Sequence, residues 1–448
     1  MQGAYKFLLP NGHQRRSCKT FKHYFLVELI IYDIVTIKKL QMSFVVWDVE
    51  VFMIKDSVRS QFSKSILHNF GERLSYERRN LVAVLVASSG AFIGFNLLFS
   101  VVPVVAERRG GQLGAGLSTG VFMITTVLGQ LSVRTVLRTV RHREVLVLGL
   151  LLIGLPAVLY AATDQILVIL TITAIRGIGF GFCTVIATLL IISYVGPSRR
   201  GSAIGMFGLV SSGTSVFGPS LGLVMLDHWG SLMFVVPATV TLILAPVAFL
   251  CPHPEFNSDR IPSTYREMLG NPLVRRPLVL LLPGTLLFGG VYTFIPLEAP
   301  EQAKIALLLF GLAMAITRTA AGRATDTIRP EIILVASVLL AAVGALFMAL
   351  QNEIAVLLVG AILGGLGTGG MMTGSLVVVL SRVCAEDYSG VSTLWNASVD
   401  SGLALGGVGL GLVAQFGGEV SIFVAAFAVF ALVTPVAVLD FRSRTPSV

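Results

Sequence analysis

Long apolar stretches recur along the chain from residue 80 onward and are separated by polar connections. A bilayer core about 30 Å thick is crossed by about 20 residues of α-helix, because each residue advances the helix by about 1.5 Å. Twelve stretches approach or exceed this length: 80–105, 114–137, 144–162, 165–192, 200–226, 231–251, 278–298, 303–321, 331–350, 354–380, 388–413 and 419–440. The pattern predicts an all-α membrane protein with twelve transmembrane helices.

One long polar connection, 252–277, interrupts the series and is rich in proline and charge. We predict that it is a cytoplasmic linker, because no other connection in the apolar part of the chain has its length. It separates two six-helix bundles, 80–251 and 278–440, and a short cytoplasmic tail follows at 441–448.

Residues 1–79 differ from the rest because they hold seven of the eight lysines. Their longest apolar run is interrupted by Glu28 and Asp33, so it is too short and too charged to cross a bilayer. We interpret the segment as a cytoplasmic N-terminal extension that is poorly ordered. The alternative is a mis-assigned start, with the true start farther along the chain, for example at Met53.

The two bundles repeat each other at a nearly constant offset of about 188 residues. The matching positions are Gly177, Gly179 and Gly181 with Gly365, Gly367 and Gly369, and, one residue farther apart, Gly201, Ser212 and Gly213 with Gly390, Ser401 and Gly402. A six-helix repeat keeps its orientation in the membrane, so the bundles are expected to be pseudo-symmetric about the membrane normal. A substrate would bind between them near the midplane, in a rocking carrier rather than a pore.

Composition and charge agree with this interpretation. Hydrophobic residues make up 54% of the chain and charged residues 13%, against about 25% charged residues in soluble domains. The net charge is +9, but the arginines concentrate in alternate connections, for example at Arg138, Arg200 and Arg275. This asymmetry predicts that both termini are cytoplasmic and that the protein lies in the cell (cytoplasmic) membrane. The expected partner is therefore the lipid bilayer, and no nucleic-acid partner is expected.

Motifs for catalysis and for metal binding are absent from the sequence. There is no Gly-Lys-Ser/Thr phosphate loop, His-Glu-x-x-His, Cys-x-x-Cys or nucleophile elbow. Gly365, Gly367 and Gly370 match a dinucleotide-binding spacing, but they lie inside an apolar stretch, where close helix packing explains them. The histidines and cysteines are scattered, so no metal site is expected. We expect a protein that is not an enzyme and has no cofactor.

Small residues in the fifth predicted helix form a motif. The motif residues are Gly205, Gly218, Pro219 and Gly222, with Thr214 and Leu223 in place of two further glycines. Together with the six-helix duplication, this motif makes residues 80–440 resemble the major facilitator superfamily, and in particular its proton-coupled exporters of drugs and metabolites. Small residues let helices approach closely, and the proline bends the helix. The alternative is a close helix contact with no bearing on the direction of transport.

The loop after the eighth predicted helix resembles the cytoplasmic gating motif of the same family. Its matching residues are Gly322, Arg323, Asp326 and Arg329. The resemblance implies that charge pairing at this loop locks the two bundles together at the inner face. The corresponding loop of the first bundle has Arg138 and Arg141 where the family has Asp and Gly, so the usual latch is absent there. The alternative is a basic cytoplasmic loop without a gating role.

Arg176 in the fourth predicted helix is expected near the bilayer midplane. The segment resembles the arginine-glycine motif of the family, although Thr173 occupies the usual arginine position and Arg176 follows one turn later. An arginine inside the membrane is costly unless it is paired or hydrated, so Arg176 is expected to face the cavity. The alternative is structural pairing with backbone groups.

Asp400 is expected near the midplane of the second bundle, about 18 Å into its helix. Ser392, Asn396 and Asp400 follow one another in steps of four, so they lie along one helix face. Because burial away from water favours the neutral form of a carboxylate, we hypothesise that Asp400 carries a coupling proton. Arg176 or the substrate would compete for this carboxylate. The alternative is an aspartate that only makes hydrogen bonds between helices.

Other polar residues within the spans are expected to line the substrate cavity. They are Asn96, Gln130, Tyr292, Trp395 and Asn396. For each of them a hydrogen bond between helices is the alternative. Because few charges lie in the spans, a small amphipathic compound is favoured over a strongly ionic one.

These observations predict a secondary active transporter that works by alternating access. The resemblance implies proton-coupled efflux, by antiport, of a small amphipathic compound such as a drug or metabolite. Protons and this compound are the expected partners besides the bilayer, and a monomer is expected because the duplicated chain contains its own two-fold axis. Two alternatives stay open, a proton-coupled uptake symporter of a small organic solute and a non-transporting membrane sensor on the same fold.

Overall fold

The computed structural model of the chain describes residues 56–195, 200–252, 264–325, 327–350, 353–384, 387–418 and 420–442. Two compact units divide the chain, Met1–Gly71 and Glu72–Val448, and the predicted spans lie in the second. Most of the predicted N-terminal extension, part of the linker and most of the tail lie outside the described residues, and so does Asp326. The domain boundaries at 79, 252 and 441 therefore stay predictions.

The described residues up to 252, which we call the first half, are almost entirely helical. Its elements are α2 (Asp56–Phe99), α3 (Val101–Val136), α4 (His142–Gly154), the 3₁₀-helix η1 (Leu155–Ala162), α5 (Ile166–Tyr194), α6 (Arg200–Trp229), the 3₁₀-helix η3 (Gly230–Phe234), α7 (Val235–Leu244) and the 3₁₀-helix η4 (Ala245–Leu250). The predicted break between the first two spans falls inside α3 at Gly111, whose φ of 59° interrupts the helix. Glycine adopts this backbone conformation without a steric penalty.

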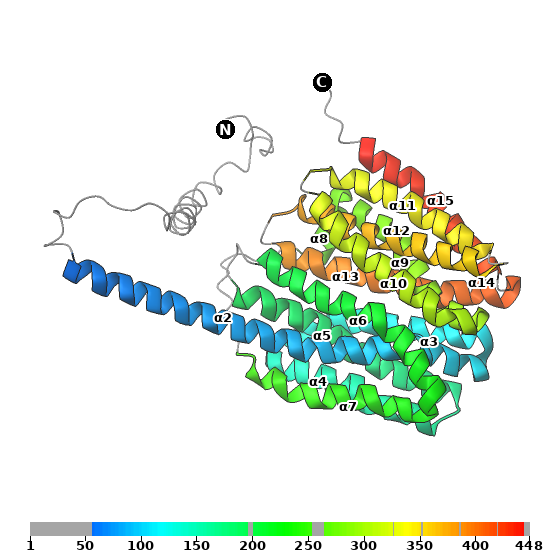
Figure 1. Cartoon of the computed structure of the whole chain (residues 1–448), viewed down its shortest axis with the longest axis horizontal. Coiled ribbons are helices and arrows are strands. Elements are labelled where there is room, and N and C mark those ends of the chain that lie inside the picture. The colour runs from blue at the N-terminus through cyan, green and yellow to red at the C-terminus, as the bar shows by residue number, and fades with distance from the viewer. Residues whose placement is uncertain are drawn as a thin grey trace, which may run out of the picture. The chain divides into compact units, whose positions relative to one another are not determined.

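The second half is helical as well. Its elements are α8 (Tyr265–Gly270), α9 (Pro272–Glu298), α10 (Pro300–Ala324), α11 (Pro330–Ala349), α12 (Ile354–Leu380), α13 (Tyr388–Ala404), the π-helical turn η6 (Leu405–Gly409), α14 (Leu410–Gly417) and α15 (Val420–Arg442). Figure 1 shows the helices of the first half, blue to green, beside those of the second half, yellow-green to red. The described residues contain helices and no strands, so the predicted all-α fold is confirmed.

Nine segments among the described residues are long and apolar enough to cross a membrane. Two of them, Glu77–Val136 with 60 residues and Met206–Leu250 with 45, are longer than the roughly 20 residues of one crossing. A shorter apolar helix, Ser421–Pro435, closes the series. The total of twelve transmembrane helices stays a prediction.

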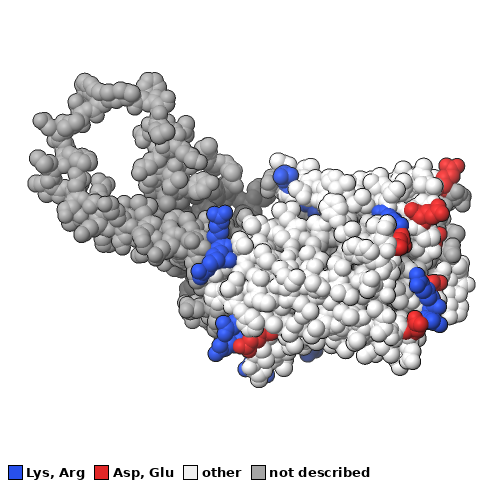
Figure 2. Space-filling view, turned by 60° about the horizontal axis from the view of Figure 1, so that its bottom comes forward, with Lys and Arg blue, Asp and Glu red and all other residues white. Residues whose placement is uncertain are grey.

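Charged residues gather at the two ends of the helices. One end, which we call the arginine-rich end, carries Arg134, Arg143, Arg275 and Arg323; the opposite end carries Glu107, Asp164, Asp227, Lys304 and Glu353. On the face drawn in Figure 2, the charged residues gather mainly toward the two ends, with a broad, largely uncharged belt between them. The sides expose large apolar side chains, such as Leu167 at 73% and Leu232 at 70%. Exposed apolar surface of this extent is typical of a face that contacts lipid.

The two halves meet along two pairs of helices. On one side α3 of the first half packs against α13, η6 and α14 of the second, and on the other side α6 packs against α10. α9 also contacts α3. In the internal repeat, α3 corresponds to α10 and α6 corresponds to α13, so the two pairs are pseudo-symmetric.

Candidate functional site

A hydrogen bond between Gln130 and Asp400 joins the two halves. The amide Nε2 of Gln130 on α3 donates to Oδ2 of Asp400 on α13 at 2.6 Å. Both residues are buried, with 2% and 7% of their surface exposed. Two residues that the sequence placed separately, one in the cavity and one at the proton site, are therefore direct partners.

The amide oxygen of Gln130 is a buried acceptor that makes no hydrogen bond with the described residues. Nε2 lies 3.4 Å from Oγ1 of Thr184, while Oε1 is buried and has no hydrogen-bond partner among the described residues. An amide has both donors and an acceptor, so it can donate to an ionised carboxylate or, after rotation, accept from a protonated one. Gln130 therefore offers Asp400 a hydrogen-bond partner in both protonation states.

No cation neutralises Asp400 within the described part of the chain. The charged residues on the helices that pack against α13 are Glu107, Arg108, Arg109 and Arg134 on α3, Arg266 and Glu267 on α8, and Arg275, Arg276 and Glu298 on α9; α12 carries none. None of them forms an ion pair with Asp400, and Arg134 instead lies over the ring of Tyr265 at 4.6 Å. A buried carboxylate without a cation is costly in its ionised form.

The contact between α6 and α10 contains a positively charged residue, Arg318, where the contact between α3 and α13 contains the acid Asp400. Nη1 of Arg318 on α10 donates to Oγ of Ser212 on α6 at 3.1 Å. Arg318 lies 188 residues after Gln130, which is the offset of the internal repeat, and Ser212 matches Ser401, the neighbour of Asp400. The contacts between α3 and α13 and between α6 and α10 are therefore pseudo-symmetric, with an acid in one and a base in the other.

A third set of contacts joins the halves nearer the opposite end. Thr119 on α3 and Thr293 on α9 form a hydrogen bond between their hydroxyls at 2.8 Å. Gly116 on α3 approaches Gly407 in η6 so closely that a Cβ on Gly116 would collide with the carbonyl oxygen of Gly407. Thr119 lies about 16 Å from Gln130 along α3, at about 1.5 Å per residue.

Tyr292, which was expected to line the cavity, belongs to this closed region. Its side chain is fully buried, and its ring stacks on that of Phe99 across the two halves, with 5.4 Å between the ring centroids. Its hydroxyl lies 3.3 Å from the carbonyl of Ser215 on α6 and 3.4 Å from that of Leu307 on α10. Tyr292 therefore closes the interface in this conformation.

A small cavity lies in the first half beside these contacts. It has a volume of about 20 Å³, which is about the room that one water molecule needs. Its lining includes Phe95, Phe99, Thr119, Phe122 and Arg176. Pockets for small organic ligands are typically about 300 Å³ or larger, so a substrate would require the halves to separate.

Arg176 is bound within the first half and makes no contact with Asp400. Its Nε donates to the carbonyl of Ile153 at 2.9 Å, and its Nη2 donates to that of Gly94 at 2.8 Å. Nη1 lies 3.4 Å from the hydroxyl of Tyr160. Arg176 borders the cavity but binds backbone carbonyls, which is the structural pairing left open as the alternative to a transport role.

The remaining polar residues expected in the cavity bind within their own halves. Nδ2 of Asn96 donates to Phe92 and to Thr214 of α6, at 2.9 and 3.1 Å. Nε1 of Trp395 donates to Ser375 at 3.1 Å, and Asn396 donates to the carbonyl of Ser392 in its own helix. None of these three side chains forms a hydrogen bond with Asp400 among the described residues.

The small residues of the fifth-helix motif make a tight contact inside the first half. In α6, a Cβ on Gly218 would lie 2.6 Å from the Cβ of Asn96, and one on Gly222 would collide with the carbonyl of Leu97. Gly205 lies near the start of this helix, and Pro219 lies within it. The predicted close helix approach is confirmed, while its bearing on transport direction stays a prediction.

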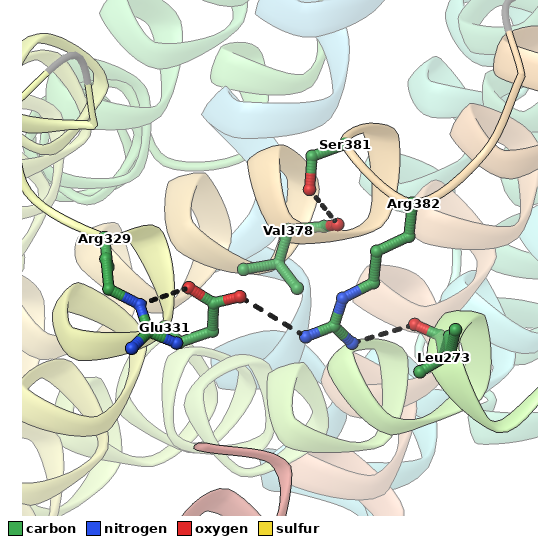
Figure 3. A network of polar contacts seen from close by, with 6 residues as sticks. All are labelled: Leu273, Arg329, Glu331, Val378, Ser381 and Arg382. Atoms are coloured by element: carbon green, nitrogen blue, oxygen red, sulfur yellow. Dashed lines mark hydrogen bonds and ion pairs between the residues drawn. The ribbon is translucent and has the colours of Figure 1, made fainter. Parts of the chain in front are cut away.

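The predicted cytoplasmic gate is described in part. Gly322 and Arg323 lie in the last turn of α10, and Asp326 lies outside the described residues. Arg329 takes part in a network that sequence reasoning missed, in which its Nε lies 3.9 Å from Glu331, a residue at the start of α11 (Figure 3).

Arg382 completes this network just beyond the end of α12. Its Nη2 lies 3.7 Å from Glu331, and its Nη1 donates to the carbonyl of Leu273 at 2.9 Å (Figure 3). The network joins α9, α11 and α12 at the arginine-rich end, all within the second half. Arg382 lies in the connection after α12 and belongs to no sequence motif. Only its position two residues after the end of α12 could have suggested its contact with Glu331.

Comparison with known proteins gives a family match over most of the chain. The family model described as Major Facilitator Superfamily matches residues 84–300 and 298–448. An uncharacterized MFS-type transporter of Escherichia coli K12, YhhS, is 26% identical over 291 residues, which cover 64% of this chain and 70% of that protein. MJ1560 of Methanocaldococcus jannaschii, also an uncharacterized MFS-type transporter, is 17% identical over 362 residues, or 77% and 94% of the two chains.

Solved structures share the fold at low sequence identity. A bacterial homologue of the human lysosomal transporter Spinster, in an inward-facing and unoccupied conformation, has a TM-score of 0.67 at 14% identity and covers 82% of this chain and 97% of its own. The human organic anion transporter MFSD10 has a TM-score of 0.59 at 17% identity, with 81% and 99% covered. At these identities the similarity shows the fold alone.

Proposed function

This chain belongs to the Major Facilitator Superfamily and is a secondary transporter, and we propose that Asp400 couples its transport to protons. The family consists of membrane transporters rather than enzymes, so the expectation of a multi-pass membrane protein that is not an enzyme is confirmed. Proton coupling, the direction of transport and the class of substrate are what we propose.

The hydrogen bond between Gln130 and Asp400 carries the proposal. A carboxylate that is buried without a cation partner is more stable when it takes up a proton, because burial disfavours its charged form. The amide of Gln130 can bind the carboxyl group in either state, so a proton can bind and leave while Asp400 keeps a partner.

The position of the bond explains how a proton would affect transport. Alternating access requires the two halves to separate at one end at a time, and Asp400 and Gln130 belong to different halves. Protonation changes the strength of this contact, because hydrogen bonds to a charged group are stronger than those between neutral groups. The proton therefore shifts the balance between two states of the carrier.

The fifth-helix motif supports export as the direction. Gly218 and Gly222 hold α6 against α2, as the resemblance to proton-coupled exporters implies. We therefore keep efflux of a small amphipathic compound such as a drug or metabolite, in exchange for protons, as the first candidate. The positive charge of the arginine-rich end supports a cytoplasmic location of that end and an orientation in the cell membrane with both termini inside.

A second candidate, cotransport of a solute with a proton, is favoured by Arg318. A cation in the same interface as Asp400 leaves a net positive charge when Asp400 is protonated. Such a charge would attract an anion together with the proton, so that both move in one direction.

The proposal is tested with inverted membrane vesicles in which respiration generates a pH gradient. A panel of permanent cations, permanent anions and neutral drugs is added while a fluorescent dye reports the gradient. The variants Asp400→Asn and Glu353→Gln are compared with the wild type, because Glu353 is an exposed carboxylate at the opposite end. A compound that changes the gradient in the wild type and in Glu353→Gln, but not in Asp400→Asn, supports the proposal. A compound that is transported with the same proton flux in all three proteins contradicts it.

A further inference from the structure

We infer that Arg318 binds the anionic group of the transported compound, which is therefore an organic anion with an apolar, aromatic body. The inference rests on the proposed function, because it assigns the substrate class to the carrier whose proton site is Asp400. It goes beyond that function because nothing in proton coupling by itself decides the charge of the substrate.

Arg318 has an incomplete set of partners. It is partly buried in α10, six residues before the end of the helix, and its guanidinium donates to Oγ of Ser212. Within the described residues no carboxylate lies within ion-pair distance of it. A guanidinium has five N–H donors, and a neutral hydroxyl satisfies one of them. An arginine inside a membrane protein without a counter-charge is typical of a substrate or ion pathway.

The location of Arg318 is the symmetric counterpart of the proposed proton site. The contact between Arg318 and Ser212 joins α10 to α6, as that between Gln130 and Asp400 joins α3 to α13. Both contacts break when the halves separate. Ser212 then moves away from Arg318, and the guanidinium requires another partner at the moment when the cavity opens.

An anion is the partner that fits the guanidinium. Its planar fork forms two parallel hydrogen bonds with a carboxylate, sulfonate or phosphate, and such charge-assisted bonds are stronger than a bond to a hydroxyl. A cation at the same place would be repelled. A neutral compound would leave the charge uncompensated, as Ser212 does in the closed interface.

The apolar body is assigned from the aromatic rings on the same side of the interface. Phe310 lies on α10, about 12 Å from Arg318 along the helix, and its ring contacts those of Phe288 and Tyr292 at 6.0 and 5.8 Å. Tyr292 in turn stacks on Phe99 of the first half. The ring of Phe288 also contacts Phe99, at 5.8 Å between centroids, so when the halves separate Tyr292 and Phe288 lose this partner and an aromatic group can stack on them.

Proton and anion would bind together. A negative charge at Arg318 favours the neutral form of Asp400, and the neutral form of Asp400 favours the anion, because the coupling between two binding sites is reciprocal. None of the other charged groups on the helices around α13 is an ion-pair partner of Asp400 among the described residues; these groups are Glu107, Arg108, Arg109, Arg134, Arg266, Glu267, Arg275, Arg276 and Glu298. The anion is therefore expected to bind more tightly at acidic pH, which is the behaviour of the second candidate function, cotransport, and not of exchange for protons.

The experiment measures binding of three probes that share a naphthalene ring. Naphthalene-2-sulfonate is a permanent anion, naphthalene-2-sulfonamide is neutral, and 2-naphthyltrimethylammonium is a permanent cation. Each is titrated calorimetrically into the full chain in lipid nanodiscs, and a pH dye in weak buffer reports proton uptake. The variants are Arg318→Gln, Arg318→Lys, Asp400→Asn and the control Arg109→Gln, which removes the same charge from an exposed residue at the opposite end.

The expected result is that the wild type and Arg109→Gln bind the sulfonate about tenfold or more tightly than the sulfonamide. Arg318→Gln loses this preference, and Arg318→Lys keeps part of it, which separates lost recognition from a general loss of folding. Proton uptake with the sulfonate occurs in the wild type and not in Asp400→Asn.

Failure of the inference and failure of the proposed function give different results. Equal or tighter binding of the neutral or cationic probe, or an anion preference that survives Arg318→Gln, overturns the inference. If the cation binds with proton release that depends on Asp400, the proposed function stands and the inference falls. If the sulfonate binds through Arg318 without any proton uptake, the inference stands and the proposed function falls.

Discussion

The amide nitrogen of Gln130 lies 2.6 Å from a carboxylate oxygen of Asp400, and this hydrogen bond connects α3 of the first half to α13 of the second. The bond places a buried acid at the interface between the halves, which opens in the proposed transport cycle. A group that changes charge at such a place changes the energy of opening.

A double-mutant cycle measures the strength of the bond. Gln130→Leu leaves a buried carboxyl group without its partner, and Asp400→Leu leaves a buried amide without its partner, so each variant loses stability. The double variant removes both polar groups and is expected to lose less than the sum, with an interaction energy of about 1.5–3 kcal/mol at alkaline pH. The free energy of unfolding is measured in detergent. An interaction energy below about 0.5 kcal/mol would mean that the two residues do not act as a pair.

Gly116→Ala is expected to open the interface at the opposite end. The added Cβ would collide with the carbonyl oxygen of Gly407, a backbone atom that cannot rotate away, so α3 and η6 must move apart. The measurement is labelling of Thr119→Cys by a membrane-impermeant maleimide in a background without native cysteines, and labelling is expected to become faster. Gly213→Ala is the control, since a Cβ there meets no atom within 4 Å. Equal labelling rates in both variants would rule out this contact as a closing element.

Arg176→Lys is expected to lower stability and to leave proton coupling intact. Lysine cannot reproduce the two bonds from Nε and Nη2 to the carbonyls of Ile153 and Gly94, and the loss is about 1–3 kcal/mol. Thermal unfolding and the response to a pH gradient are measured on the same preparation. A variant of normal stability that has lost proton coupling would instead support the competition between Arg176 and Asp400 that the sequence suggested.

Cysteine labelling tests the orientation of the chain. Cys384 is exposed between α12 and α13 at the arginine-rich end, whereas burial raises the pKa of the Cys251 thiol to about 11. Because the thiolate is the reactive form, this raised pKa and the burial of the side chain both slow the labelling of Cys251 at neutral pH. In a Cys18→Ser background, an impermeant maleimide should label Cys384 in inverted vesicles and not in intact cells. Labelling of intact cells would place the arginine-rich end outside.

The sequence predicted the helices well, because each transmembrane helix repeats one simple physical requirement, about 20 apolar residues. It also identified Gln130 as a polar residue within the spans and Asp400 as an acid near the midplane, and both are buried. It did not predict that they are partners, because a helical pattern determines which residues share a face but not which other helix that face contacts. The internal repeat contains a further signal, the correspondence of Gln130 and Arg318 at an offset of 188 residues.

Arg176 is a clearer example of a contact that the sequence pattern leaves undetermined. A buried arginine needs polar partners, because its charge is costly inside the membrane. Backbone carbonyls meet this need as well as a carboxylate does. In the structure, Arg176 donates to the backbone carbonyls of Ile153 and Gly94. Nothing in the sequence separates these two outcomes, because the carbonyls that become accessible depend on how closely α2, α4 and α5 pack. The same holds for Arg382, whose partner Glu331 lies on another helix.

Infrared spectroscopy tests the central claim, proton binding by Asp400, without any knowledge of the substrate. The full chain in lipid is exchanged between about pH 5 and about pH 9, and difference spectra are recorded in the carbonyl region, where a protonated carboxyl group absorbs apart from an ionised one. We expect a protonated carboxyl band in the wild type that disappears in Asp400→Asn, remains in Glu353→Gln and changes its frequency in Gln130→Leu, because the hydrogen bond to the carboxyl group is lost. Identical difference spectra of the wild type and Asp400→Asn would show that Asp400 does not exchange a proton in this range, and would contradict the proposed coupling.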